Sequence, residues 1–399
     1  MRHARLPQLR SLLSAAAIAV IAACADSEDT GGAIVEDGGA PEAPPDVDGG
    51  ADAADAEEGD AAVRTCSDQG FCHVVVPPNE TLRDVWGDGT TVWAVSEQGH
   101  VLRWDGQKWG VHTKKLGALY AIWGSGPTDI WIGGARGLYH GSGASSQAIV
   151  FEPVDAPGDP EIPILSIWGT GPDDVLAVGG NVSFFDGMPH ARVLRLRRGG
   201  DAGPGWELDP ISAEPFVFKR VWGSTAAGAW IAGDDGSDFP QTSGAFVRAP
   251  GTDELLPVTI DADLPDESVE QGIATAISGG GMTADGRVLV IGKTPSTPAF
   301  WYGAVGDDGT VTWTFERRKE SDLPLWAVWS VAGEATWVAG DYGTLRSRDV
   351  SGAKWMPAAM MVSDFPVIEP LYGIWGTAPD DFWVVGHDTA IHRMPREEP

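Results

Sequence analysis

The chain has 399 residues, 27 of them basic and 57 acidic, which gives a formal net charge of −30. Residues 1–23 carry three arginines and no acid, residues 25–63 carry 13 acids and no base, and residues 64–399 carry 24 basic and 44 acidic side chains. The body, residues 64–399, therefore has a net charge of −20 and repels polyanions. Because no basic stripe follows the chain, we expect no nucleic-acid partner.

The first 23 residues predict an export signal. A basic start is followed by about 13 apolar residues, too few for a membrane-spanning helix, which needs about 20. The segment ends in Ile21-Ala22-Ala23-Cys24, which resembles the lipobox of bacterial lipoproteins. The resemblance implies that Cys24 carries a lipid. Because Ala25 rather than aspartate follows, it also implies an outer-membrane anchor if the host is Gram-negative. The alternative is ordinary cleavage, with Cys24 incidental.

Residues 24–63 predict a disordered acidic tether between the signal and the body. After the cysteine they are almost wholly Ala, Gly, Asp, Glu and Pro, without an aromatic residue. Such a composition cannot bury enough apolar surface to offset the entropy lost on ordering. We expect a random-coil reach of roughly 35 Å, longer under charge repulsion. This tether would hold the body away from the lipid surface.

The two cysteines of the body, Cys66 and Cys72, predict a disulfide. Two nearby thiols in an exported chain normally oxidise. The alternative is a metal site formed by these cysteines and His73, although no second pair of ligands follows.

One phrase recurs through residues 64–399, as in LYAIWGSGPTDIWIGG at residues 119–134. An apolar segment ending in Trp-Gly is followed by a polar turn, a second apolar segment and a glycine-bearing turn. Third and fourth strands follow in the best copies. The first-tryptophan position falls at residues 86, 123, 168, 222, 278, 329 and 375, with Ser278 in place of tryptophan in the one blurred copy.

Four short strands in a unit of about 40 to 55 residues are typical of a propeller blade. We therefore predict an all-β fold, a seven-bladed β-propeller of four-stranded blades over residues 64–399. The last copy stops after its third strand, whereas residues 71–76 precede the first copy and have no blade of their own. We infer that residues 71–76 form the fourth strand of the seventh blade, which would remove an exposed sheet edge.

The repeats resemble a known family. IWGSGPTDIWIGG, IWGTGPDDVLAVGG and VLRWDGQKW are similar to the tryptophan-rich YVTN and BNR-like propeller repeats of bacterial secreted and surface lipoproteins, over residues 73–394. The resemblance implies the fold. It implies no single function, because such propellers include adhesins, assembly factors, glycan binders and a minority of enzymes. The Asp-box of BNR repeats is not met, and GDDGTVTW at residues 306–313 comes nearest.

We assign the repeated tryptophans to packing between blades rather than to a sugar platform. A basic residue recurs in the third strands and is expected to lie against tryptophan rather than to form a ring of ligand-binding cations. The tryptophans are Trp86, Trp123, Trp168, Trp222, Trp329 and Trp375 in the first position and Trp93, Trp131, Trp230, Trp337 and Trp383 in the second. The basic residues are Arg103, His140, Arg195, Arg248, Arg346 and His392.

The position three residues before the first tryptophan shares no requirement among the copies. It begins the innermost strand, so its side chains are expected to ring the mouth of the central channel. The variable loops 141–163, 180–191, 234–244 and 249–271 should feed the same face. The residues at this position are Arg83, Tyr120, Leu165, Lys219, Thr275, Trp326 and Tyr372.

Five of these residues are candidate binding residues. Two tyrosines, a tryptophan and two cations could hold a glycan or an acidic peptide by stacking and charge. The alternative is ordinary solvent contact at the strand ends. The five are Arg83, Tyr120, Lys219, Trp326 and Tyr372.

The sequence offers no catalytic, metal or cofactor pattern. None of the five tyrosines stands beside a glutamate, and the eight histidines show no HxH or HExxH spacing. GDDGSD at residues 233–238 could hold calcium, but it is expected to be a solvated turn. We therefore expect a monomeric, lipid-anchored binding or scaffold module for a protein or glycan partner at the cell envelope. The alternatives are a propeller-type polysaccharide hydrolase or lyase and a structural envelope lipoprotein.

Overall fold

The computed structural model describes residues 66–197, 205–237, 241–262, 272–306, 308–319, 322–358, 360–362 and 365–394. Residues 61–399 belong to one compact unit. The predicted signal segment, Cys24 and the tether lie outside the described residues. In the part that is described, no helix is long and apolar enough to cross a membrane.

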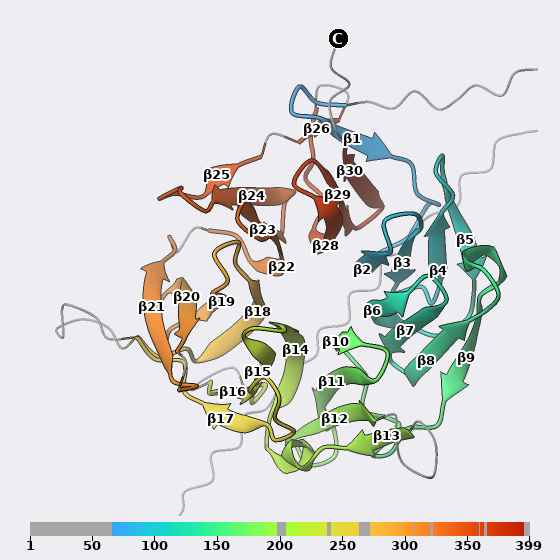
Figure 1. Cartoon of the computed structure of the whole chain (residues 1–399). Helices are drawn as coiled ribbons and strands as arrows, with labels where there is room; N and C mark the ends of the chain where they lie inside the picture. The colour runs from blue at the N-terminus through green and yellow to red at the C-terminus, as the bar shows by residue number, and fades with distance from the viewer. Residues whose placement is uncertain are drawn as a thin grey trace, which may run out of the picture. The chain divides into compact units, whose positions relative to one another are not determined.

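Within the described residues, seven four-stranded antiparallel sheets form a ring around a central channel (Figure 1). We number these sheets as blades 1 to 7 in chain order. The prediction of an all-β, seven-bladed propeller is confirmed. Two 3₁₀ turns, η1 (Ser146–Ala148) and η2 (Pro210–Ala213), and a two-stranded ribbon of β26 (Met361–Val362) and β27 (Phe365–Pro366) lie in the connections.

Each blade has an inner strand at the channel, a second strand, a third strand and an outer strand. From blade 1 to blade 7, the inner strands are β2 (Leu82–Gly87), β6 (Leu119–Gly126), β10 (Ser166–Gly171), β14 (Val217–Ser224), β18 (Ala276–Met282), β22 (Leu325–Val331) and β28 (Leu371–Ala378). In the same order, the second strands are β3 (Val92–Ser96), β7 (Asp129–Gly134), β11 (Asp174–Val182), β15 (Gly228–Asp234), β19 (Val288–Lys293), β23 (Ala335–Gly340) and β29 (Asp381–Gly386). The third strands are β4 (Val101–Trp104), β8 (Gly137–Ser142), β12 (Pro189–Arg197), β16 (Ser243–Arg248), β20 (Pro298–Val305), β24 (Thr344–Asp349) and β30 (Thr389–Arg393). The outer strands are β5 (Trp109–Thr113), β9 (Val150–Val154), β13 (Gly205–Leu208), β17 (Leu256–Val258), β21 (Val311–Arg317), β25 (Met356–Pro357) and β1 (Phe71–Val74).

Blade 7 joins the two ends of the ring. Strand β1 pairs antiparallel with β30, from Phe71 opposite Arg393 to Val74 opposite Ala390. A disulfide links Cys66 to Cys72, next to this strand. Because both sulfurs are bonded to each other, the alternative of a metal site that includes these cysteines is wrong.

Four of the seven seams between adjacent blades share one contact. In these seams, the first tryptophan of a blade lies on the glycine that follows the first tryptophan of the next blade. A side-chain carbon at that glycine would clash with the ring, so the close approach requires glycine. The distances from this added carbon to the ring are 2.5 Å for Gly124 and Trp86, 2.7 Å for Gly87 and Trp375, and 2.9 Å both for Gly169 and Trp123 and for Gly223 and Trp168.

Blade 5 corrects the predicted register. Gly281, not Ser278, pairs with Leu289, as Trp86 pairs with Trp93 in blade 1. Ser278 therefore takes the position predicted for Thr275, at the channel mouth, and Thr275 lies before β18. The predicted register was wrong because the run Gly279–Gly281 has no side chains to mark which face of the strand is buried.

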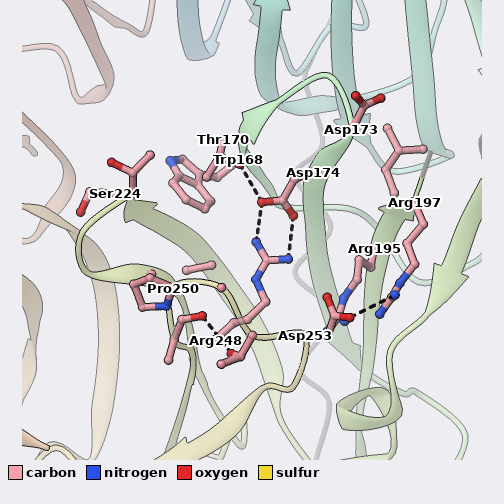
Figure 2. A pocket seen from close by; sticks show the side chains of 17 residues that line it. Trp168, Thr170, Asp173, Asp174, Arg195, Arg197, Ser224, Arg248, Pro250 and Asp253 are labelled. Carbon is pink, nitrogen blue, oxygen red and sulfur yellow. Dashed lines mark hydrogen bonds and ion pairs between the residues drawn. The ribbon is translucent and has the colours of Figure 1, made fainter. Parts of the chain in front are cut away.

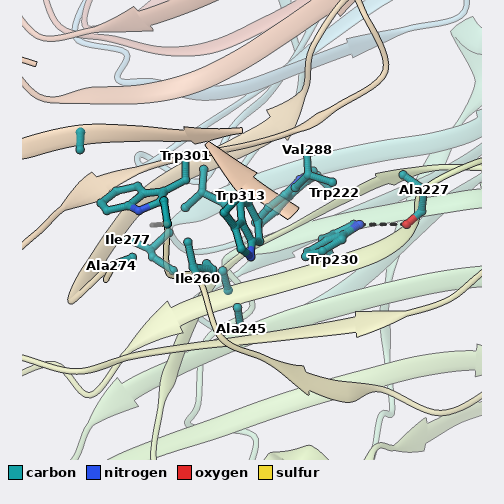
Figure 3. Packing of buried hydrophobic residues seen from close by; sticks show 14 residues of the cluster. Trp222, Ala227, Trp230, Ala245, Ile260, Ala274, Ile277, Val288, Trp301 and Trp313 are labelled. Atoms are coloured by element: carbon teal, nitrogen blue, oxygen red, sulfur yellow. Dashed lines mark hydrogen bonds between the residues drawn. The ribbon is translucent and has the colours of Figure 1, made fainter. Parts of the chain in front are cut away.

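The tryptophans of blade 5 lie on its third and outer strands instead, Trp301 on β20 and Trp313 on β21. Trp301 and Trp313 pack with Trp222 and Trp230 of blade 4 (Figure 3). Trp301 is fully buried, and its Nε1 donates to the carbonyl of Gly272 at 2.6 Å. The seam between blades 4 and 5 is therefore as rich in tryptophan as the others, although the inner strand of blade 5 contributes none.

Candidate functional site at the channel mouth

Three of the five predicted binding residues line one pocket. Arg83, Trp326 and Tyr372 begin the inner strands of blades 1, 6 and 7. These blades are neighbours in the ring, so the three side chains meet at the channel mouth. The cavity has a volume of about 610 Å³, and its other lining residues are Asp341, Tyr342, Ile368 and Pro370. We call it the mouth pocket.

Specific contacts hold the walls of the mouth pocket. The Arg83 guanidinium lies 4.2 Å from the centroid of the Tyr372 ring, and its Nη1 is 3.3 Å from Oε1 of Glu97. Trp326 Nε1 donates to Oδ1 of Asp341 at 2.8 Å. The aromatic rings are thus oriented by a cation on one side and a carboxylate on the other.

Tyr342 stands exposed at the rim of the mouth pocket. The residue is 68% exposed, and its φ of +51° lies in the left-handed region, which is unfavourable for a side chain other than glycine, asparagine or aspartate. The turn is fixed by backbone hydrogen bonds from Asp341 N to Pro324 O at 3.0 Å and from Gly343 N to Glu369 O at 2.9 Å. The backbone conformation belongs to the hairpin turn, since Asp388 at the equivalent place in blade 7 has a φ of +46°, and the exposed aromatic ring is what distinguishes blade 6.

The other two predicted binding residues do not line the mouth pocket. Lys219 Nζ lies 2.6 Å from Oδ2 of the buried Asp234, so its charge is compensated within blade 4. The same contact engages a carboxylate of the GDDGSD turn, in which Asp235 accepts hydrogen bonds from Ser237 and Thr242. Tyr120 begins the inner strand of blade 2.

The channel below the mouth holds two charged residues that we did not predict. Five residues at the position two before the first tryptophan line a cavity of about 400 Å³, and three of these are small. The exceptions are Asp84 and Arg220. The contrast with the small residues is visible in the sequence and could have singled them out. The five are Asp84, Ser166, Arg220, Ala327 and Gly373.

Asp84 connects the neighbouring blades 1 and 2, and Arg220 connects blades 4 and 6. Asp84 accepts hydrogen bonds from the backbone N of Val85 at 2.9 Å and of Ile122 in blade 2 at 3.0 Å. Arg220 Nη2 donates to the carbonyl of Trp326 in blade 6 at 2.8 Å. Burial raises the pKa of Asp84 to about 6, although these backbone hydrogen bonds and the charge of Arg220 act in the opposite direction. This pair braces the channel.

The basic residues of the third strands pack as predicted in blades 2 and 7. In blade 2, His140 stacks on Trp131 with ring centroids 4.1 Å apart, and its Nε2 lies 2.6 Å from Oδ1 of Asp129. Blade 7 repeats this arrangement with a stacking distance of 4.2 Å and a hydrogen bond of 2.8 Å, through His392, Trp383 and Asp381.

A second cavity of about 610 Å³ lies between blades 3 and 4 (Figure 2). Arg248 crosses the seam and donates to both oxygens of Asp174, at 2.6 and 2.8 Å. Burial raises the pKa of Asp174, but the hydrogen bonds from Arg248 and Thr170 outweigh it and hold the pKa below its usual value. Arg195 and Arg197, which also line the cavity, pair with Asp209 at 2.6 Å and Asp253 at 3.3 Å. This cavity is therefore a set of compensated ion pairs, without an exposed aromatic rim.

A tyrosine and a glutamate that are distant in sequence do meet in blade 5. Tyr302 Oη donates to Oε2 of Glu316 at 2.7 Å and accepts from Arg348 at 2.9 Å and Trp355 at 3.3 Å. Burial raises the pKa of Tyr302, and the charge of Glu316 raises it further. An activated tyrosine nucleophile needs the opposite shift, so we interpret this group as a structural tie.

The mouth pocket is lined by aromatic, aliphatic and charged side chains. One carboxylate, that of Asp341, lines it, whereas glycoside hydrolysis commonly uses a pair. Among the described residues, no group of three or more His, Cys, Asp or Glu side chains is arranged to hold a metal ion. What the mouth pocket offers is aromatic surface with an arginine and an aspartate at its sides, which suits stacking and hydrogen bonding.

Comparisons with known proteins support the fold alone. No known family model matches the chain, and no curated protein matches it. A structure of YCF48 bound to D1 peptide is 18% identical with a TM-score of 0.57, covering 84% of this chain and 100% of that one. A streptogramin B lyase structure is 10% identical with a TM-score of 0.57, covering 81% and 96%. YCF48 from Cyanidioschyzon merolae is 14% identical with a TM-score of 0.55, covering 82% and 99%.

Proposed function

We propose that this propeller is a binding module for a segment of a protein partner, held in the mouth pocket. The observation that carries the proposal is the convergence of Arg83, Trp326 and Tyr372 from three blades, with the exposed Tyr342 at the rim. Aromatic rings give a large contact area at low entropic cost and are enriched at the centres of protein interfaces. A fold neighbour solved with a peptide bound adds support from analogy.

The ligand test compares two tyrosines of the pocket with one outside it. Residues 25–399 would be screened against a displayed peptide library and a glycan array, and the affinity of the best ligand measured by calorimetry. We expect Tyr342→Ala with Tyr372→Ala to weaken peptide binding at least about tenfold, as for interface hot spots. Tyr120→Ala is the matched control and should leave the affinity unchanged.

The screen also separates the alternatives. If the array rather than the library gives ligands that depend on the two tyrosines, the partner is a glycan. If no ligand depends on them, the mouth pocket is not the binding site, and a structural role for the propeller is favoured.

We also propose that the propeller is exported and held at the cell envelope by a lipid on Cys24. The support is the sequence at residues 21–24 and the acidic tether that follows it. In the native host, Cys24→Ser should move the protein from the membrane fraction to the soluble fraction and abolish labelling by a fatty acid. Membrane retention of the variant would contradict anchoring by the lipid, and a fatty-acid label that persists in the variant would contradict lipidation at Cys24.

A further inference from the structure

Blade 3 carries an aromatic projection that the mouth pocket does not use. Strands β11 and β12 pair over nine residue pairs and end in a turn, residues 182–188, which we call the finger. At its tip, Phe184 is 98% exposed and Phe185 is 95% exposed. Val182 and Met188 at its base are 45% and 54% exposed. Two adjacent phenylalanines without protein cover are costly in water, so an apolar environment is expected to receive them.

The finger is ordered by its own hydrogen bonds. Ser183 N donates to Met188 O, and Gly187 N donates to Ser183 O, both at 2.9 Å. The Asp186 carboxylate accepts from Met188 N at 2.9 Å, and Gly187 has a φ of +68° that suits the turn. The rings are therefore presented on a preformed support, and little entropy is lost when they are buried.

The finger stands on the same face of the propeller as the mouth pocket. The start of β10 pairs with the end of β11, where Ser166 lies opposite Val178, so residues beyond Val178 extend from the face at which inner strands begin. Blade 3 lies across the channel from blades 6 and 7 (Figure 1). The finger and the mouth pocket therefore occupy opposite sides of one face.

The small size and convex shape of the finger favour a fluid surface over a protein surface. Two aromatic side chains supply roughly 300 to 500 Å² of contact, whereas a stable protein interface buries about 800 Å² on each partner. A lipid bilayer needs no shape complementarity, and shallow insertion of aromatic side chains into it is favourable. The predicted tether would set an upper limit on the distance from the membrane, because a chain from Cys24 with a reach of roughly 35 Å still lets the finger contact the anchoring bilayer.

The charges select the kind of lipid surface. Asp186 lies beside Phe185 and is paired with His190 at 3.2 Å, and the body has a net charge of −20. Both features oppose an anionic membrane. We propose that the finger inserts Phe184 and Phe185 into a zwitterionic bilayer surface and so turns the mouth pocket toward the membrane. The inference rests on the proposed anchoring at Cys24, which makes a bilayer the nearest apolar phase.

Vesicle flotation tests the finger without the lipid anchor. All seven blades are built from Phe71 onward, so residues 25–399 contain the complete propeller. This protein would be mixed with vesicles of phosphatidylcholine and phosphatidylethanolamine, and its partition coefficient measured against lipid concentration. We expect Phe184→Ser with Phe185→Ser to lower the coefficient at least about tenfold, because insertion scales with buried apolar area. Phe184→Trp with Phe185→Trp should preserve it.

The control removes exposed apolar side chains from the opposite face. Val150 and Met356 are 61% and 62% exposed at the starts of outer strands, so Val150→Ser with Met356→Ser should leave partitioning unchanged. Vesicles that contain phosphatidylglycerol should bind more weakly, and salt should strengthen that binding by screening repulsion.

Equal partitioning of the wild type and the Phe184/Phe185 double variant would overturn the proposal, and so would binding that rises with phosphatidylglycerol and falls with salt. A protein ligand that depends on the two phenylalanines while vesicles do not bind would also overturn it. Loss of peptide binding in the Tyr342/Tyr372 variant with vesicle binding intact would separate this inference from the function of the mouth pocket.

Discussion

The seam between blades 1 and 2 and the seam between blades 5 and 6 meet the same packing requirement with different chemistry. In the first seam, Trp86 lies on Gly124. In the second, Gly281 offers no ring, and a side-chain carbon there would lie 2.6 Å from Val328. Blade 6 correspondingly has Ser330 after its first tryptophan, where five other blades have glycine. In this comparison, the seam with a tryptophan ring has glycine beneath the ring. The seam without the ring has serine at the same position, because no ring excludes a side chain there.

Hydrogen bonds replace the missing ring at the second seam. Arg348 of blade 6 donates to Tyr302 and Glu316 of blade 5, at 2.9 and 2.8 Å. The backbone N of Ala284 donates to Oγ1 of Thr336 across the same seam at 2.8 Å. The seam between blades 5 and 6 therefore adds these polar contacts to an apolar cluster that both blades share.

Removal of the Trp86 ring from the seam between blades 1 and 2 should have the largest effect on stability. We expect Trp86→Ala to lower the free energy of unfolding by roughly 3 to 5 kcal/mol, because it leaves a cavity between blades 1 and 2. Urea denaturation followed by circular dichroism measures this loss. Phe184→Ala removes an exposed ring and should change the free energy by no more than about 0.5 kcal/mol. Equal effects of the two substitutions would contradict the assignment of Trp86 to packing.

Asp84 makes the stability of the seam between blades 1 and 2 depend on pH. Its pKa rises from 3.8 to about 6 on folding, so the folded state binds more protons than the unfolded state between these values. Asp84 therefore contributes less stability as the pH rises from about 4 to about 6. Relative to the wild type, Asp84→Asn should gain at most about 3 kcal/mol over this interval. Urea unfolding of both proteins at several pH values tests the slope, and a constant difference would show that Asp84 is not buried as a charge.

A matched pair of substitutions compares the two seams directly. Gly124→Ala places a carbon 2.5 Å from the Trp86 ring and should cost about 1 to 3 kcal/mol through overpacking. Ser330→Ala, at the equivalent position of the seam without a ring, should change stability by less than about 0.5 kcal/mol. Thermal melting of both variants is the measurement. A similar cost at both positions would mean that the glycine is required by the strand and not by the ring.

Removal of one hydroxyl group, that of Tyr302, should weaken the seam between blades 5 and 6. Tyr302→Phe keeps the aromatic ring but removes the acceptor used by Arg348 and Trp355 and the donor to Glu316. We expect a loss of about 1 to 2 kcal/mol, typical of buried polar groups left without a partner. Chemical denaturation measures it. An unchanged stability would show that the Tyr302 hydroxyl does not stabilise the seam between blades 5 and 6.

Regular spacing made the blades and part of the mouth pocket predictable from the sequence. Arg83, Trp326 and Tyr372 were found because they vary at a position whose neighbours repeat. The partners Asp341 and Tyr342 were missed because the turn between the second and third strands recurs in the copies but its residue types differ, as in Ala135 and Arg136 of blade 2. Physically, a repeat fixes where a strand begins, but only the folded ring determines which loops reach that point.

Two other features of the site escaped sequence reasoning for different reasons. Asp84 and Arg220 were overlooked although the contrast with small residues at their position was present, because the sequence does not mark which side of the strand faces the channel. The register of blade 5 could not be predicted, because Gly279–Gly281 lacks the alternation of side chains that marks a strand's two faces.

The pairing of β1 with β30 also determines when the ring can close during folding. The strand that closes the ring is made first, and its partner is the last strand of the propeller, so this contact has nearly the largest sequence separation that the propeller allows. Contacts between residues far apart in sequence form slowly, because the intervening chain must lose conformational entropy before the contact adds stability. The nascent propeller thus stays open until its final strand appears.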